Sequence, residues 1–320
     1  MRISLAFATA LAATPAAGDF VLRLPVDCVP GESCHIQNYF DHLPSPQAQD
    51  YRCGGLSYDG HKGTDFALPT LAEMREGVAV LAAADGIVRG VRDGMPDRKY
   101  SPQNASRIAD RECGNGVAIV HEGGWETQYC HLRQGSVEVA PGDRVSAGTV
   151  LGQIGLSGKT QFPHLHLSVR RNGQEVDPFD PDAPSASCGA PKDDLWDVAP
   201  RYQPGGLLTA GFSDAIPKYE TVLEGTAAKE TLEPASPAMV LFGHAFGGRK
   251  GDIIRLRISG PDGTILSHES VLEKAQAQLF RAAGRPLTAP RWPAGAYTGT
   301  VEMVRDGRPL SSKNVSIFIP

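Results

Sequence analysis

The stretch Tyr58-Asp-Gly-His-Lys-Gly-Thr-Asp-Phe66 places a histidine, His61, four residues before a carboxylate, Asp65, with glycines nearby. About a hundred residues later the chain reads Pro163-His-Leu-His-Leu-Ser168, in which histidine alternates with leucine. Successive side chains of a strand point to opposite faces of a sheet, so the two histidines of the second stretch would share one face. We therefore expect a β-sheet that carries two imidazoles on the same side.

Two imidazoles on one face indicate a metal site. Zinc enzymes typically use three protein ligands drawn from His and Asp/Glu and leave a fourth position for water. His61, Asp65 and one of His164 and His166 would supply that number. If both strand histidines bound the metal, the site would be a closed tetrahedron of the structural kind. If only one did, the other would be free for proton transfer.

The order His-x-x-x-Asp and then His-x-His resembles the pattern of the lysostaphin-like (M23) zinc peptidases, the LytM-type peptidoglycan endopeptidases. The resemblance runs from His61 to Pro178 and is not confined to these four positions. The matching segments are His61-Lys-Gly-Thr-Asp-Phe-Ala-Leu-Pro69, Ala84-Asp-Gly-Ile-Val88, Gly114-Asn-Gly-Val-Ala-Ile-Val-His121, Gln128-Tyr-Cys-His-Leu132, Gly148-Thr-Val-Leu-Gly-Gln-Ile-Gly155 and Val176-Asp-Pro178.

The resemblance implies a role for five side chains. His61, Asp65 and His166 would bind one zinc ion per chain, and His131 and His164 would be the catalytic histidines. All five positions are filled here, whereas relatives that act only as amidase activators have lost zinc ligands. The implied activity is zinc-dependent hydrolysis of peptide bonds in the stems or cross-bridges of bacterial peptidoglycan. The alternative is a non-catalytic envelope module with a structural zinc site and a partner-binding sandwich.

Composition and the N-terminus bear on partners and location. With 320 residues, 41% hydrophobic and 21% charged, the chain has a globular composition and room for two domains. Its net charge of -5 provides no basic field for nucleic acid. Residues 1–17 combine one positive charge, an apolar run and small residues, as in a signal peptide, and no other stretch is long enough to span a membrane. We expect an exported protein, periplasmic or extracellular.

Six cysteines fit an oxidising compartment, and none belongs to a Cys-x-x-Cys motif. The chain pattern favours three disulfides. The first closes a short loop, the second flanks an expected hairpin over residues 117–131, and the third uses the remaining pair. These disulfides are Cys28–Cys34, Cys113–Cys130 and Cys53–Cys188.

The expected fold class is all-β. A lead-in segment, residues 18–57, precedes an antiparallel β-sheet M23-type domain, residues 58–182, and a linker, residues 183–210. Alternating apolar residues with Asp-Gly turns then predict a small immunoglobulin-like β-sandwich over residues 211–320, which we expect to be dispensable for bond cleavage.

Two further segments leave less specific predictions. Gly158-Lys-Thr160 is not a phosphate-binding loop, because Gln153 replaces the required glycine and Pro163 stands where a helix should begin. Residues 92–112 form a polar, turn-rich connection that is longer than usual. It would either wall a substrate groove or be exposed decoration.

Overall fold

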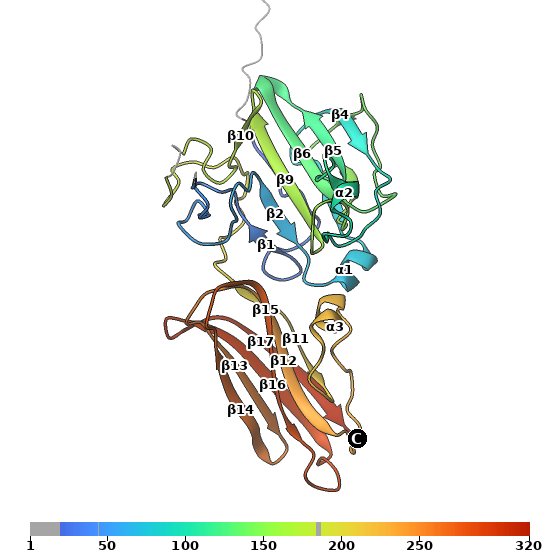
Figure 1. Ribbon diagram of the computed structural model, residues 1–320, viewed down its shortest axis with the longest axis vertical. Coiled ribbons are helices and arrows are strands. Elements are labelled where there is room, and N and C mark those ends of the chain that lie inside the picture. Colours follow the sequence, from blue (N-terminus) through green and yellow to red (C-terminus); the bar gives the residue numbers. More distant parts are fainter. Residues whose placement is uncertain (1–19, 44, 184–186) are drawn as a thin grey trace, which may run out of the picture.

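The structure is a computed structural model that describes residues 20–43, 45–183 and 187–320 (Figure 1). It confirms the all-β fold class: the chain forms antiparallel sheets, and the described part adds three short α-helices and one 3-10 helix. Strands β1 to β10 make one unit, and strands β11 to β17 make a second unit below it in Figure 1. The expected signal peptide lies outside the described residues.

The first unit is built on an eight-stranded sheet with the order β1-β2-β9-β6-β5-β4-β7, and β10 pairs with β9. A separate pair, β3 (Ala79–Leu81) and β8 (Val150–Gln153), lies beside it. The sheet strands are β1 (His35–Asn38), β2 (Thr64–Ala67), β4 (Gly86–Arg92), β5 (Asn115–Val120), β6 (Trp125–Leu132), β7 (Arg144–Val145), β9 (His164–Arg171) and β10 (Gln174–Val176).

Strand β9 has one buried apolar face and one face that carries two histidines. Leu165, Leu167 and Val169 are almost completely buried on one face, and the alternation of a strand places His164 and His166 on the other. The buried side chains of this unit, together with Leu208 and Phe246 of the second unit, form the first core. Its larger members are Leu22, Ile36, Tyr39, Phe66, Ile119, Tyr129, Leu132, Leu151, Ile154, Leu165, Leu167, Phe179, Trp196, Leu208 and Phe246.

The helices are short and their ends follow local sequence. In α1 (Leu71–Glu76), the Thr70 hydroxyl accepts a hydrogen bond from the Ala72 amide at 3.2 Å, and Gly77 ends the helix at a φ of 94°. The others are α2 (Ala105–Ile108), the 3-10 helix η1 (Glu122–Gly124) and α3 (Tyr219–Glu224). No described helix is long and apolar enough to cross a membrane.

The second unit is a two-layer β-sandwich. One sheet has the order β11-β12-β15 and the other β14-β13-β16-β17. Tyr297, near the start of β16, donates its hydroxyl to the Pro293 carbonyl at 2.7 Å, a tyrosine-corner contact found in immunoglobulin-like sandwiches. The strands are β11 (Gly206–Ser213), β12 (Ala238–Gly248), β13 (Ile253–Gly260), β14 (Gly263–Val271), β15 (Gln276–Pro286), β16 (Gly295–Arg305) and β17 (Arg308–Ile319).

The two units share buried contacts. Leu208 of β11 and Phe246 of β12 pack into the first core, although both belong to sandwich strands. Gln37 of β1 donates to the Ala277 carbonyl at 3.1 Å and accepts from the Gln278 side chain at 3.0 Å, both in β15. The sandwich therefore contacts β1, the edge strand of the sheet that carries the histidines.

The segment expected to be a linker also packs against the first unit. Trp196 is buried in the first core, and the Tyr202 hydroxyl donates to Asp50 at 2.9 Å. The lead-in segment is likewise part of the sheet, since it supplies β1. The contact between Tyr202 and Asp50 thus joins the segment after the M23-like region to the segment before it.

The three disulfides in the structure are the pairs expected from the sequence. Cys28–Cys34 closes its short loop, Cys53–Cys188 joins segments 135 residues apart, and Cys113–Cys130 links the ends of β5 and β6, with Cα atoms 4.8 Å apart. No described cysteine is free.

The long connection, residues 92–112, lies against the 156–160 segment. Asp97 accepts a hydrogen bond from the Leu156 amide at 2.7 Å, and the Tyr100 amide donates to the Thr160 carbonyl at 2.7 Å. These bonds place Lys99 and Tyr100 beside the loop that leads into β9.

Candidate metal centre

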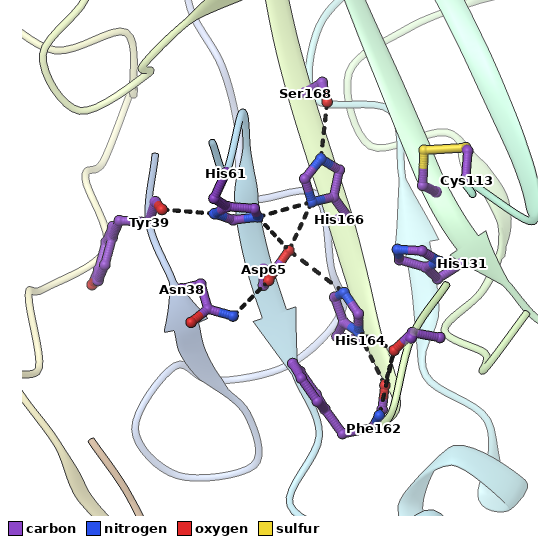
Figure 2. A network of polar contacts seen from close by, with 12 residues as sticks. Asn38, Tyr39, His61, Asp65, Cys113, His131, Phe162, His164, His166 and Ser168 are labelled. Carbon is purple, nitrogen blue, oxygen red and sulfur yellow. Dashed lines mark hydrogen bonds and ion pairs between the residues drawn. A yellow bond between two sulfur atoms is a disulfide. The ribbon is translucent and has the colours of Figure 1, made fainter. Parts of the chain in front are cut away.

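Strand pairing brings the metal-ligating residue types together. In the antiparallel pairing of β2 with β9, Asp65 lies opposite His166 and Ala67 lies opposite His164. On the other side of β2, β1 places Asn38 opposite Asp65. His61 precedes β2 and points toward the same carboxylate (Figure 2). His61 and Asp65 are four residues apart, and they come together because a turn leads from His61 into β2. They do not lie on one face of a helix.

Three donor atoms form a compact triangle. His61 Nε2 lies 3.1 Å from Asp65 Oδ1 and 3.1 Å from His166 Nδ1, and His166 Nδ1 lies 2.8 Å from Asp65 Oδ1. Ligands about 2.05 Å from a tetrahedral zinc ion would be about 3.3 Å apart, so the triangle has nearly the size of one face of that tetrahedron. Within the described residues this is the one group of three that could hold a metal ion in this way.

Further contacts orient the three donors. Asn38 Nδ2 donates to Asp65 Oδ2 at 2.8 Å, which leaves Oδ1 for the triangle. His61 Nδ1 donates to the Tyr39 carbonyl at 2.7 Å, so Nε2 keeps its lone pair. His166 Nε2 pairs with the Ser168 hydroxyl at 3.0 Å, and Nδ1 faces the triangle. Such outer contacts fix the tautomer and rotation of metal-binding histidines.

His164 and His131 lie beside the triangle without belonging to it (Figure 2). His164 Nε2 is 3.5 Å from Asp65 Oδ1, and its Nδ1 donates to the Phe162 carbonyl at 3.0 Å. His131 Nδ1 donates to the Ser157 carbonyl at 2.7 Å, and the rings of His131 and His164 are 4.6 Å apart. In both rings the Nδ1 bond leaves Nε2 with a lone pair.

The backbone at His131 adopts a conformation unusual for a residue with a Cβ atom. Its φ is 67°, in the left-handed region, which costs about 1–3 kcal/mol. The neighbouring Cys130 is bonded to Cys113, and the His131 amide donates to the Cys113 carbonyl at 2.8 Å. The disulfide and this hydrogen bond hold the turn that aims the imidazole at His164.

Burial and charge set the protonation of the group. Burial raises the pKa of Asp65, but the interactions of its carboxylate with His61, His164 and His166 outweigh burial and hold that pKa well below its usual value. Burial lowers the pKa of His61, but Asp65 raises it to a net increase. Burial lowers the pKa of His131 and of His164, and in His131 the neighbouring His164 and His166 add to the effect. A neutral imidazole pair thus lies beside an ionised carboxylate.

The geometry extends the residues expected from the sequence. The five histidine and aspartate positions lie together, although they come from β2, β6, β9 and the loop before β2. The residues that orient them were not expected from the sequence. These are Asn38, Tyr39, Ser157, Phe162 and Ser168. Four of the five contacts use a backbone carbonyl or a hydroxyl, and such groups leave no spacing pattern in the sequence.

The part of the chain that contains the metal centre is similar to known peptidases. Residues 59–178 match the model of peptidase family M23. This part of the chain is an M23 peptidase domain. The match begins just before His61 and ends after Asp177, so it contains all five site positions and leaves out the sandwich.

Two curated relatives are similar over the M23 domain. The DD-carboxypeptidase/endopeptidase Mpg of Neisseria meningitidis is 35% identical over 120 residues, which are 37% of this chain and 22% of the relative. The peptidoglycan DD-endopeptidase ShyA of Vibrio cholerae is 31% identical over 148 residues, 46% of this chain and 29% of the relative. The chain therefore matches about a quarter of the length of these proteins.

Among solved structures, the catalytic domain of the prophage-encoded M23 protein EnpA from Enterococcus faecalis is 27% identical, in its A109H variant. The match covers 45% of this chain and 96% of that domain, with a TM-score of 0.30.

Proposed function

We propose that the protein is an exported zinc-dependent endopeptidase that hydrolyses peptide bonds in the stems or cross-bridges of bacterial peptidoglycan. The observation that carries the proposal is the triangle of His61 Nε2, Asp65 Oδ1 and His166 Nδ1 with two neutral histidines beside it. A His-Asp-His set leaves a fourth position open, as catalytic zinc sites do. The M23 match and the names of the two relatives support a peptidase that acts on the cell wall.

In this mechanism His61, Asp65 and His166 would hold the zinc ion. When bound, zinc polarises a carbonyl group and lowers the pKa of a bound water toward about 7. His131 and His164 would handle the proton: each donates through Nδ1 to a backbone carbonyl and presents a free lone pair at Nε2. One of them takes the proton of the attacking water and returns it to the amine that leaves when the peptide bond breaks.

The proposed location follows from disulfides and the N-terminal sequence. Three disulfides are expected in an oxidising compartment and are rare in the cytosol. Residues 1–17 have the pattern of a signal peptide. Peptidoglycan lies in the periplasm or outside the cell, so location and substrate agree.

A second candidate is a non-catalytic envelope module with a structural zinc site. The observation that favours it is the distance of 3.5 Å from His164 Nε2 to Asp65 Oδ1, which is also close to a tetrahedral edge. A four-ligand site of His61, Asp65, His164 and His166 would have no place for water.

Zymography on purified peptidoglycan, with and without a chelator, tests the two candidates. We expect a cleared zone that disappears with the chelator and returns when zinc is added. A protein that holds one zinc ion per chain and clears no peptidoglycan would favour the structural module.

A further inference from the structure

A cleft of about 710 Å³ lies between the two units. One wall comes from the first unit and includes Lys99 and Tyr100 of the long connection and Phe162 and Pro163 before β9. The other wall comes from the sandwich and is made by α3 and by the segment from Lys274 to Gln278. We call it the lysine cleft, after Lys99 and Lys274.

The lysine cleft reaches the metal centre. Asn38, which lines it, holds the carboxylate of Asp65 at 2.8 Å. Phe162, also in its wall, stacks on the ring of His164 with centroids 4.5 Å apart and accepts the hydrogen bond from its Nδ1. A peptide bound in the cleft would therefore reach His164, one of the two histidines proposed to transfer the proton.

The walls of the cleft are joined by specific contacts. The buried side chain of Gln37 bonds to Ala277 and Gln278 at 3.1 and 3.0 Å. Arg75 of α1 forms an ion pair with Glu224 of α3. Both contacts cross from one unit to the other, so the spacing between the walls is held by the fold.

The charge of the lysine cleft is opposite to that of the whole chain. Lys99 and Lys274 are exposed, neither forms an ion pair with a described residue, and the described lining contains no carboxylate side chain. The chain as a whole has a net charge of -5. Two unpaired cations in an otherwise neutral wall are complementary to an anion.

A second cleft, which touches the metal centre at His61, has the reverse character. Its described lining contains five carboxylates, one lysine and, besides His61, one histidine. They are Asp41, Asp59, Glu175, Asp177 and Asp180, with Lys62 and His42. A carboxylate of a bound peptide would be repelled there and attracted to the lysine cleft, so the two sides of the centre are electrostatically distinct.

We propose that the lysine cleft binds the part of the peptide substrate that carries a free carboxylate, and that Lys99 and Lys274 pair with that carboxylate. The inference rests on the proposed peptidase function and deepens it: it makes the sandwich and the long connection part of substrate selection. The class of ligand is an acidic peptide segment next to the bond that is cut.

The test uses two non-hydrolysable fluorescent peptides that differ in one group, a terminal carboxylate or the corresponding amide, and their cleavable forms. Binding is measured by anisotropy at low salt for the full-length wild type, Lys99→Ala, Lys274→Ala and the double variant. Lys313→Ala is the matched control, because this sandwich lysine of β17 does not line the cleft. Lys274→Arg keeps the charge and should behave as wild type.

The double variant should bind the carboxylate peptide about three- to tenfold more weakly, the range for two exposed ion pairs, and the amide peptide within about twofold of wild type. With the cleavable peptides, KM for the carboxylate form should rise by the same factor while kcat stays unchanged. Equal binding of both peptides by wild type, or equal losses for both in the double variant, would overturn the inference. If wild type prefers the carboxylate but cleaves neither peptide, the cleft assignment holds and the proposed peptidase function fails.

Discussion

Acid should destabilise this protein through two histidines at the junction of its units, His35 of β1 and His244 of β12. Their side chains are almost completely buried, and burial lowers the pKa of each to about 4 from 6.5. The hydrogen bond of His35 with Gln37 at 3.1 Å raises the pKa of His35 in part, whereas the interaction with His244 lowers it. Both imidazoles are thus neutral in the folded protein at neutral pH.

The sign and size of the effect follow from proton binding. In the unfolded chain each imidazole has a pKa of about 6.5, so between pH 6.5 and 4 the unfolded state binds more protons than the folded state. The contribution to the free energy of unfolding is complete above pH 6.5 and is lost as the pH falls toward 4. A shift of about 2.5 units amounts to about 3 kcal/mol per histidine, of which about 2 kcal/mol is lost by about pH 5.

Urea unfolding at about pH 7.5 and about pH 5 measures this loss. Trp125 and Trp196 report on the first unit and Trp292 on the sandwich by fluorescence. His35→Leu and His244→Leu should each remove about 2 kcal/mol of the pH-dependent loss. His268→Leu, at an exposed position of β14, is the control and should leave it unchanged. The same pH-dependent loss in wild type and in both buried-site variants would refute the reasoning.

The remaining predictions concern the metal centre and the packing around it. His166→Ala should lose zinc, whereas His164→Ala should keep it and lower kcat by a factor on the order of 10² to 10⁴; metal analysis beside kinetics decides, and parallel loss of zinc and activity in His164→Ala would make that residue a ligand. Replacing Cys113 and Cys130 together with serine opens a loop of 17-residue separation and should cost about 3 kcal/mol of stability. It should also lower kcat more than zinc content, because the disulfide holds the left-handed backbone at His131; unchanged kcat in the folded variant would argue against that role. Asn38→Ala should weaken zinc affinity about 10- to 100-fold by freeing the carboxylate of Asp65, as competition with a chelating dye would measure; an unchanged affinity would show that β2 alone orients the carboxylate. A chain that ends at Pro204 should still bind zinc, since every donor precedes it, but should melt at a lower temperature because Leu208 and Phe246 leave the first core; an unaltered melting temperature would mean that the sandwich does not stabilise the first unit.

Much of the chemistry was readable from local pattern. The His-x-His alternation with leucines predicts two imidazoles on the polar face of a strand, and β9 carries them so, because the period of a strand is a property of the backbone. The same holds for β13, where Ile254, Leu256 and Ile258 are buried as their alternation with arginine predicts. Cysteine spacing led to Cys28–Cys34 and Cys113–Cys130 for a related reason, since a short loop and a hairpin bring their ends close, and Cys53–Cys188 followed as the remaining pair.

Other strands had no such pattern. Strand β12 is buried at nearly every position, so it lacks the alternation that marks a strand with one wet face. Its neighbours β11 and β15 pair with it over long stretches, and neither was predicted as a strand from the sequence. A continuous apolar run is compatible with a strand or a buried helix, and only pairing in three dimensions distinguishes them.

What the sequence alone determined was the set of side chains able to bind a metal ion and move a proton, because those roles depend on residue type and near-neighbour spacing. Only the tertiary structure decided how they are oriented and what surrounds them. Asn38 reaches Asp65 because β1 pairs with β2. Lys274 lines the same cleft as Lys99 because Gln37 of β1 is hydrogen-bonded to Ala277 and Gln278 of β15. Lys99 and Lys274 are 175 positions apart in the chain, and no local rule couples residues at that separation. The shared packing of the two units brings them to one cleft.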